Sequence, residues 1–216
     1  MRAFVRTLLG TVSALLAVGL FGTAAAAVVS PSGDRAKAEL WTAMGTQWSD
    51  SARYTREYYV AALLGGAHPG AAQAAAASLM KNQKDIGAVF AKYYGTGTGD
   101  QISDILSQQV AIAADLVPAA GAGDKAKLAD ATARWQQSHA ELAKVLSTAN
   151  PDHFPYEQTR QLLDRNLALL TTAVTSFAGG DYAQSIAGNE AYYQDVQNLV
   201  GYFGNGIVAE FPEQFK

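Results

Sequence analysis

The sequence predicts an all-α protein, an antiparallel bundle of about six helices built from three tandem helical hairpins. Apolar residues recur three or four positions apart in every long segment after residue 33, which is the period of an amphipathic helix. No window shows the strict alternation of a β-strand. The breaks between the helical segments are short, so neighbouring helices are expected to be antiparallel.

A sequence unit that occurs about three times supports the same fold. Gly-rich junctions precede two aspartates, Asp124 and Asp181. The offset that places Asp124 on Asp181 also places Leu142 on Leu199, and nearly the same offset places Leu79 on Trp135. A repeat of this length that contains only helical patterns predicts a helical hairpin copied in tandem.

The N-terminal stretch has the pattern of an export signal. Arg2 and Arg6 precede an apolar run at 8–21, and small residues at 23–27 suit a signal peptidase. We therefore expect a signal peptide at 1–26 and an exported protein, found outside the cell or in the cell envelope. The alternative is an uncleaved segment that anchors the chain in the membrane, because the apolar run is nearly long enough to span it.

The composition sets limits on the mature protein. After a flexible linker at 27–33, residues 34–216 are predicted to form a single helical domain. The chain has no cysteine, so an exported protein of this kind must depend on its core rather than on disulfides. Hydrophobic residues make up 49% of the sequence and charged residues 16%, which is enough for a sizeable core. A net charge of −3 gives no basic surface for nucleic acid.

The first three helices are bounded by glycine, proline and aspartate. The first is expected to begin near Asp34 and to end at Gly65-Gly66, and Pro69 suits the first position of the second. The segment Gly95–Gly99 is interpreted as a flexible connector, because it lacks the Lys-Ser/Thr ending of a phosphate-binding loop. Asp100 is then expected to cap the third helix.

The other boundaries follow from the same signals. Pro118 and the glycines after it are expected to stop the third helix. Asp124 and Asp181 are predicted N-caps of the fourth and sixth helices, and Asn150-Pro151 separates the fourth helix from the fifth. The sixth helix is expected to continue until Pro212.

Each helix interrupts its apolar stripe near the middle with a polar residue. These residues recur at intervals close to the repeat period, so the fold predicts a polar layer at one height in the bundle. A buried polar group without a partner costs about 1–3 kcal/mol, so the members must bond one another, water or a ligand. The layer either fixes helix register through hydrogen bonds and ordered water, or lines a pocket for a small molecule or ion. The candidate binding residues are Ser51, Gln109 and Asn166 on the odd helices and Asn82, Ser138 and Asp195 on the even helices.

Arg56 is a seventh candidate. It lies in a tyrosine-rich part of the first helix and could clamp a buried anion. The more common arrangement is an ion pair with a carboxylate, because nearly all buried charges are paired. The carboxylates considered are Glu57, Asp115 and Asp164.

The sequence does not predict a catalytic or metal site. His68, His139 and His153 have no i, i+4 spacing, and without cysteine there is no thiolate ligand, so they are interpreted as surface or loop histidines. No Gly-x-Ser-x-Gly nucleophile motif occurs, and Ser138 beside His139 does not form a triad, because adjacent helix residues do not face each other. We therefore expect no metal and no cofactor, and a non-enzymatic role is favoured.

Several fragments of the chain, in order, are similar to the signature of a family of small exported bacterial all-helical proteins. They are Trp48 to Arg56, Asn82 to Gly87, Tyr93-Tyr94-Gly95, Asn150-Pro151, and Gly206-Ile207 with Phe211-Pro212. The resemblance covers the chain from about residue 40 to the end and implies an all-helical bundle without an established activity. In the family, histidines commonly occupy the places of Ser51, Gln109 and Asn166 and one near Asp195, and asparagine the places of Asn82 and Ser138, so this chain departs from the family at every histidine place.

Two functions are compatible with these observations. The first is a non-enzymatic binding or structural protein of the bacterial envelope or exterior, with an unknown small ligand or an envelope protein as its partner. The second is a metal- or small-ligand-dependent bundle, redox or enzymatic, whose usual histidine positions are replaced. Neither hypothesis involves nucleic acid as a partner. Membrane contact is expected only through residues 1–26, if they are not removed.

Overall fold

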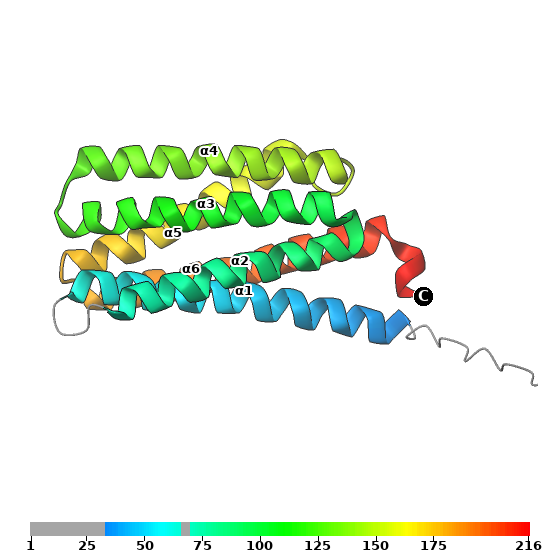
Figure 1. Cartoon of the computed structure of the whole chain (residues 1–216), viewed down its shortest axis with the longest axis horizontal. Helices are drawn as coiled ribbons and strands as arrows, with labels where there is room; N and C mark the ends of the chain where they lie inside the picture. Colours follow the sequence, from blue (N-terminus) through cyan, green and yellow to red (C-terminus); the bar gives the residue numbers. More distant parts are fainter. Residues whose placement is uncertain (1–32, 66–69) are drawn as a thin grey trace, which may run out of the picture. The chain divides into compact units, whose positions relative to one another are not determined.

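The computed structural model describes residues 33–65 and 70–216 (Figure 1). Within these residues the protein is an all-α bundle of six helices, as predicted, and all of them belong to one compact unit. The predicted signal peptide at 1–26 and most of the predicted linker lie outside the described residues, as do His68 and Pro69. The helices are α1 (Gly33–Leu64), α2 (Gly70–Tyr94), α3 (Thr96–Gly121), α4 (Lys125–Ala149), α5 (Tyr156–Ala178) and α6 (Tyr182–Glu210), followed by the 3-10 helix η1 (Pro212–Phe215).

The helices form a closed ring around a common interior. Each helix packs against the next one along the chain, and α6 packs back against α1 (Figure 1). The odd helices α1, α3 and α5 also contact one another across the interior. The three hairpins α1–α2, α3–α4 and α5–α6 therefore take equivalent places, which is what a threefold repeat requires.

Two of the predicted helix caps are confirmed. The Asp124 carboxylate accepts a hydrogen bond from the Lys127 backbone N–H at 3.0 Å, and the Asp181 carboxylate accepts one from Gln184 at the same distance. Each aspartate follows a glycine with positive φ, Gly123 at 65° and Gly180 at 81°, which turns the chain between hairpin partners. The repeated Gly-Asp pair is thus a repeated turn.

The connection between α2 and α3 differs from the prediction. Gly95 alone, with φ 86°, separates the two helices, and α3 already begins at Thr96, so Gly95–Gly99 is not a connector and Asp100 is not a cap. The reason is a close contact between the helices: a Cβ at Gly99 would lie 2.6 Å from the Gly87 carbonyl oxygen. The glycines after residue 95 serve helix packing rather than flexibility.

The third helix ends at the predicted glycines, but Pro118 does not stop it. Pro118 lies inside α3, which continues to Gly121. Proline removes one backbone hydrogen bond, but it stands close to the helix end, and the burial of Val117 and Ala119 holds the last turn against the core. The boundaries of α1, α4, α5 and α6 agree with the sequence prediction, including the continuation of α6 as far as Pro212.

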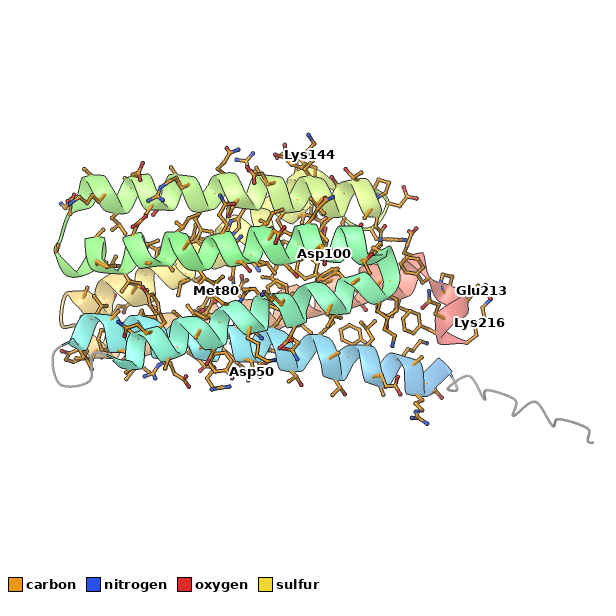
Figure 2. All side chains as sticks on the ribbon, viewed as in Figure 1. Asp50, Met80, Asp100, Lys144, Glu213 and Lys216 are labelled. Atoms are coloured by element: carbon orange, nitrogen blue, oxygen red, sulfur yellow. The ribbon has the colours of Figure 1, made fainter. Side chains whose placement is uncertain are left out.

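The loop between α4 and α5 is fixed by a buried asparagine. The Asn150 side-chain amide donates to the Tyr94 hydroxyl at 2.9 Å and to the Gly206 carbonyl at 3.1 Å. Phe154, which is fully buried, packs against the rings of Tyr94 and Phe203 and so closes this end of the core. Outside the core, Lys144 and Glu213 point into solvent (Figure 2).

None of the described helices combines the length and the apolar character that crossing a membrane would require.

Candidate functional site: a polar cavity in the bundle core

A cavity of about 70 Å³ lies in the core and is lined by residues from all six helices. Most of the lining is apolar, with side chains such as Leu106, Val110 and Leu167. A belt of uncharged polar side chains interrupts it, with Ser51 from α1, Gln109 from α3 and Asn166 among its members. An apolar pocket with a few converging polar groups is the usual form of a small-molecule site.

The cavity lining follows the sequence repeat. Positions one repeat period apart contribute equivalent wall segments, so the three hairpins surround the cavity in the same way. The polar positions of the odd helices form one such set. The equivalent trios are Trp48, Leu106 and Leu163; Ser51, Gln109 and Asn166; Tyr59, Val117 and Val174; Leu79, Trp135 and Tyr192; and Gln83, His139 and Val196.

Within each hairpin a hydrogen bond joins the odd helix to the even helix at this height. The Gln109 amide donates to the Ser138 hydroxyl at 3.0 Å, and the Asn166 amide donates to the Asp195 carboxylate at 3.1 Å. In the first hairpin the Gln83 amide donates to the Ser51 hydroxyl at 3.4 Å. The polar layer is therefore internally paired, one pair for each hairpin.

The predicted even-helix residues lie behind the cavity wall instead of lining it. Asn82 is buried and donates to the Gln47 backbone and side-chain oxygens, at 2.9 and 3.1 Å. Ser138 is buried and donates to the Trp135 carbonyl at 2.7 Å. Asp195, with a side chain only 5% exposed, is ion-paired with Arg165. Ser138 and Asp195 accept from the lining amides of Gln109 and Asn166, and Asn82 Oδ1 accepts from the Gln83 amide at 3.2 Å, so these three residues orient lining side chains.

These hydrogen bonds determine which atom of each side-chain amide remains without a partner. The Ser138 hydroxyl hydrogen is used on a backbone carbonyl, so this hydroxyl must accept from the Gln109 N–H₂ group. The ionised Asp195 carboxylate only accepts, so Asn166 must present its N–H₂ group there. The N–H₂ groups of Gln83, Gln109 and Asn166 are used in these bonds, so three amide oxygens remain as acceptors on cavity-lining side chains: Gln83 Oε1, Gln109 Oε1 and Asn166 Oδ1.

His139 contributes a ring-nitrogen acceptor. Its ring is buried in the cavity wall, and Nδ1 lies 2.9 Å from Asp164 Oδ1. Burial lowers the pKa of His139, and this effect outweighs the opposing effect of the Asp164 carboxylate, so the imidazole is neutral at neutral pH. A carboxylate accepts and does not donate, so the proton is on Nδ1 and Nε2 carries a lone pair.

The interpretation of His139 as a surface or loop residue is therefore wrong. The buried face of α4 includes Ser138 and His139 together with Leu142, and an apolar stripe alone does not reveal a buried polar residue beside it. The sequence repeat does indicate that this position lines the cavity. Gln83 and His139 are one repeat period apart, each directly follows a predicted polar position, and both line the cavity.

Aromatic side chains close the cavity on several sides. The Trp48 indole Nε1 is buried without a hydrogen-bond partner among the described residues. Burial raises the pKa of Tyr192 to about 12 and also raises the pKa of Tyr58 and Tyr59, so these phenols stay protonated and neutral.

Arg56 does not belong to this site, and its prediction as a core residue is wrong. Its side chain is exposed, because the helix turns Tyr59 rather than Arg56 toward the interior. Arg56 forms no ion pair within the described residues. The three carboxylates considered for it have other partners: Glu57 pairs with Arg53, Asp115 with Arg134, and Asp164 with His139 and Arg160.

The lining has no formally charged side chain. Across residues 33–65 and 70–216, no aspartate, glutamate, lysine or arginine lines the cavity. In the same part of the chain, no group of three or more histidine, cysteine or acidic side chains is placed to share a metal ion. The polar groups that the cavity does offer are neutral: amide oxygens, hydroxyls, one imidazole and the Trp48 indole N–H.

Comparison with protein-family models, with curated proteins and with solved structures gave no match. The chemistry of the cavity is therefore the basis on which a function can be assigned.

Proposed function

We propose that the protein is exported and that it binds a small, neutral, hydrogen-bond-donating molecule in its core cavity, without transforming it. The observation that carries this proposal is the set of acceptors on the wall: the amide oxygens of Gln83, Gln109 and Asn166 and the lone pair of His139. Export is supported by the signal pattern at 1–26.

The neutrality of the ligand follows from the wall. Moving an ion out of water into a cavity without a countercharge carries a large desolvation penalty. Asp164 and Asp195, the carboxylates that contact His139 and Asn166 from behind the wall, are already paired with Arg160 and Arg165. A neutral donor, in contrast, can bond the acceptors on the wall without bringing in a charge.

The size of the cavity limits the ligand and its affinity. A volume of about 70 Å³ corresponds to about two waters, or about half of a cavity that holds benzene. An organic ligand would then have about three or four non-hydrogen atoms. At a ceiling of about −1.5 kcal/mol per atom, binding would not exceed about −6 kcal/mol, a Kd of tens of micromolar.

A titration followed by ¹H–¹⁵N NMR tests this proposal. The probes are acetamide, which donates hydrogen bonds, and acetonitrile, which is of similar size and only accepts. We expect acetamide to produce saturable shifts of the Gln109 and Asn166 side-chain amides and of backbone amides around the cavity, and acetonitrile to bind more weakly.

Two matched variants locate the binding. Ala113 lines the cavity, and Ala113→Leu should fill it and abolish the acetamide shifts. Ala75 is equally buried in α2 but does not line the cavity, and Ala75→Leu should retain them. If Ala113→Leu does not fold, Val110→Ile makes a smaller change at the same wall and should weaken binding. Non-saturating shifts, or equal affinity in both alanine variants, would contradict a core site and favour a hydrated layer that only fixes helix register.

A further inference from the structure

His139 connects the cavity with solvent through a short chain of polar contacts. Its side chain is 5% exposed, its partner Asp164 is 22% exposed, and Arg160, whose Nε is 3.5 Å from the other Asp164 oxygen, is 44% exposed. Asp164 and Arg160 lie one turn apart on α5, and His139 faces them from α4. A buried imidazole that is held by a carboxylate on one side and borders a cavity on the other is an arrangement that fixes the tautomer of histidine.

We propose that His139 is the residue that selects hydrogen-bond-donating ligands in this cavity, that Asp164 is its positioning residue, and that protonation of His139 releases the ligand. This inference rests on the proposed function. Asp164 accepts from Nδ1, so Nε2 presents a lone pair and can only accept. A donor ligand matches this lone pair, and an acceptor-only ligand does not.

The surroundings of His139 explain why protonation would reverse the preference. From α5 it meets Asp164 and, behind it, Arg160. Within the described residues, α1, α2, α3 and α6 add no formally charged side chain to the cavity wall, and their titratable groups there are the protonated phenols of Tyr58, Tyr59 and Tyr192. Protonated His139 would donate from Nε2 toward the cavity, where it would oppose the N–H of a donor ligand.

The tautomer can be measured without a ligand. Long-range ¹H–¹⁵N spectra of the imidazole at about pH 8, where an unperturbed histidine is neutral, should show a proton on Nδ1 and a bare Nε2 for His139. A proton on Nε2 instead would overturn the inference, because the cavity would then face a donor. Asp164→Asn, in which an amide can donate to Nδ1, should shift the population toward the Nε2–H tautomer.

The affinity for acetamide, measured from about pH 8 down to a pH at which the imidazole ¹⁵N spectrum shows His139 to be protonated, tests the release on protonation. If only neutral His139 binds, the affinity of the wild type should fall about tenfold per pH unit below the pKa of His139. His139→Gln keeps an acceptor but cannot titrate, so its affinity should not change over this range. His153→Gln, in the α4–α5 loop and away from the cavity, should behave like the wild type.

Asp164→Asn adds a readout that a purely structural role would not change. At about pH 8 this variant should bind acetonitrile better and acetamide worse than the wild type, which reverses the selectivity. A wild type that binds acetamide equally at both ends of the pH range, or an Asp164→Asn variant with unchanged selectivity, would overturn this inference alone. Failure of the wild type to bind acetamide even at about pH 8 would overturn the proposed function together with it.

Discussion

Asp195 carries the buried charge of the polar layer, and a buried charge needs partners to offset its desolvation. It has lost nearly all contact with water and depends on Arg165 from α5 and on the Asn166 amide. A buried ion that loses a partner is strongly destabilising, because its desolvation is no longer offset. Asn166 therefore has two roles, since it holds this carboxylate with its N–H₂ group while its oxygen remains free.

The variant Asn166→Leu tests the first of these roles. Leucine cannot donate to Asp195, so we expect the free energy of unfolding to fall by about 1–3 kcal/mol in urea denaturation. The control is Asn198→Leu on α6, an exposed asparagine, which should change stability by less than about 0.5 kcal/mol. Equal effects of the two substitutions would mean that the Asn166–Asp195 contact does not stabilise the fold.

At the scale of single residues, the sequence predicted the lining side chains of the odd helices but not those of the even helices. Ser51, Gln109 and Asn166 interrupt apolar stripes at the repeat period, and all three line the cavity. On the even helices the prediction was shifted by one position, because His139 and Gln83 face the cavity while their preceding neighbours lie behind it. One residue along a helix is a rotation of about 100°, and a single sequence does not fix that rotation for a mixed polar pair.

At the scale of elements, close packing of α2 on α3 depends on two facing glycines. A Cβ at Gly87 would lie 2.5 Å from the Gly99 carbonyl oxygen, and a Cβ at Gly99 would lie 2.5 Å from the Ala91 Cβ. Glycine pairs of this kind let helix backbones approach closely, and the sequence pattern cannot distinguish them from glycines that break a helix. For this reason the start of α3 was predicted several residues too late.

The variant Gly99→Ala tests this contact. The added methyl group overlaps backbone atoms that cannot move away, so we expect the free energy of unfolding to fall by about 1–3 kcal/mol. Gly97→Ala, two residues earlier in the same helix and with open space around its Cβ position, should leave stability unchanged or raise it by up to about 1 kcal/mol. Thermal and urea denaturation of both variants measure the difference. If Gly99→Ala were as stable as Gly97→Ala, the close contact between α2 and α3 would not contribute to stability.

At the scale of the whole molecule, the tandem repeat produces the cavity. Three equivalent hairpins close into a ring, so each odd helix brings its polar position to the same interior space. The helical period, the Gly-Asp turns and the repeat spacing were enough to predict the six helices and the polar layer. The enclosed volume depends on how the large side chains of the wall, such as Trp48 and Trp135, fill the interior, and this is a property of packing in three dimensions.

The most direct test of the central claim is to locate bound acetamide by intermolecular NOEs to ¹³C-labelled wild-type protein. The account predicts NOEs from the acetamide methyl protons to buried methyl groups of the wall, for example those of Leu106, Val110 and Leu167. Ile186, an exposed apolar residue on α6, should show none. NOEs confined to Ile186 and other surface side chains, with none to the three wall residues, would contradict the account.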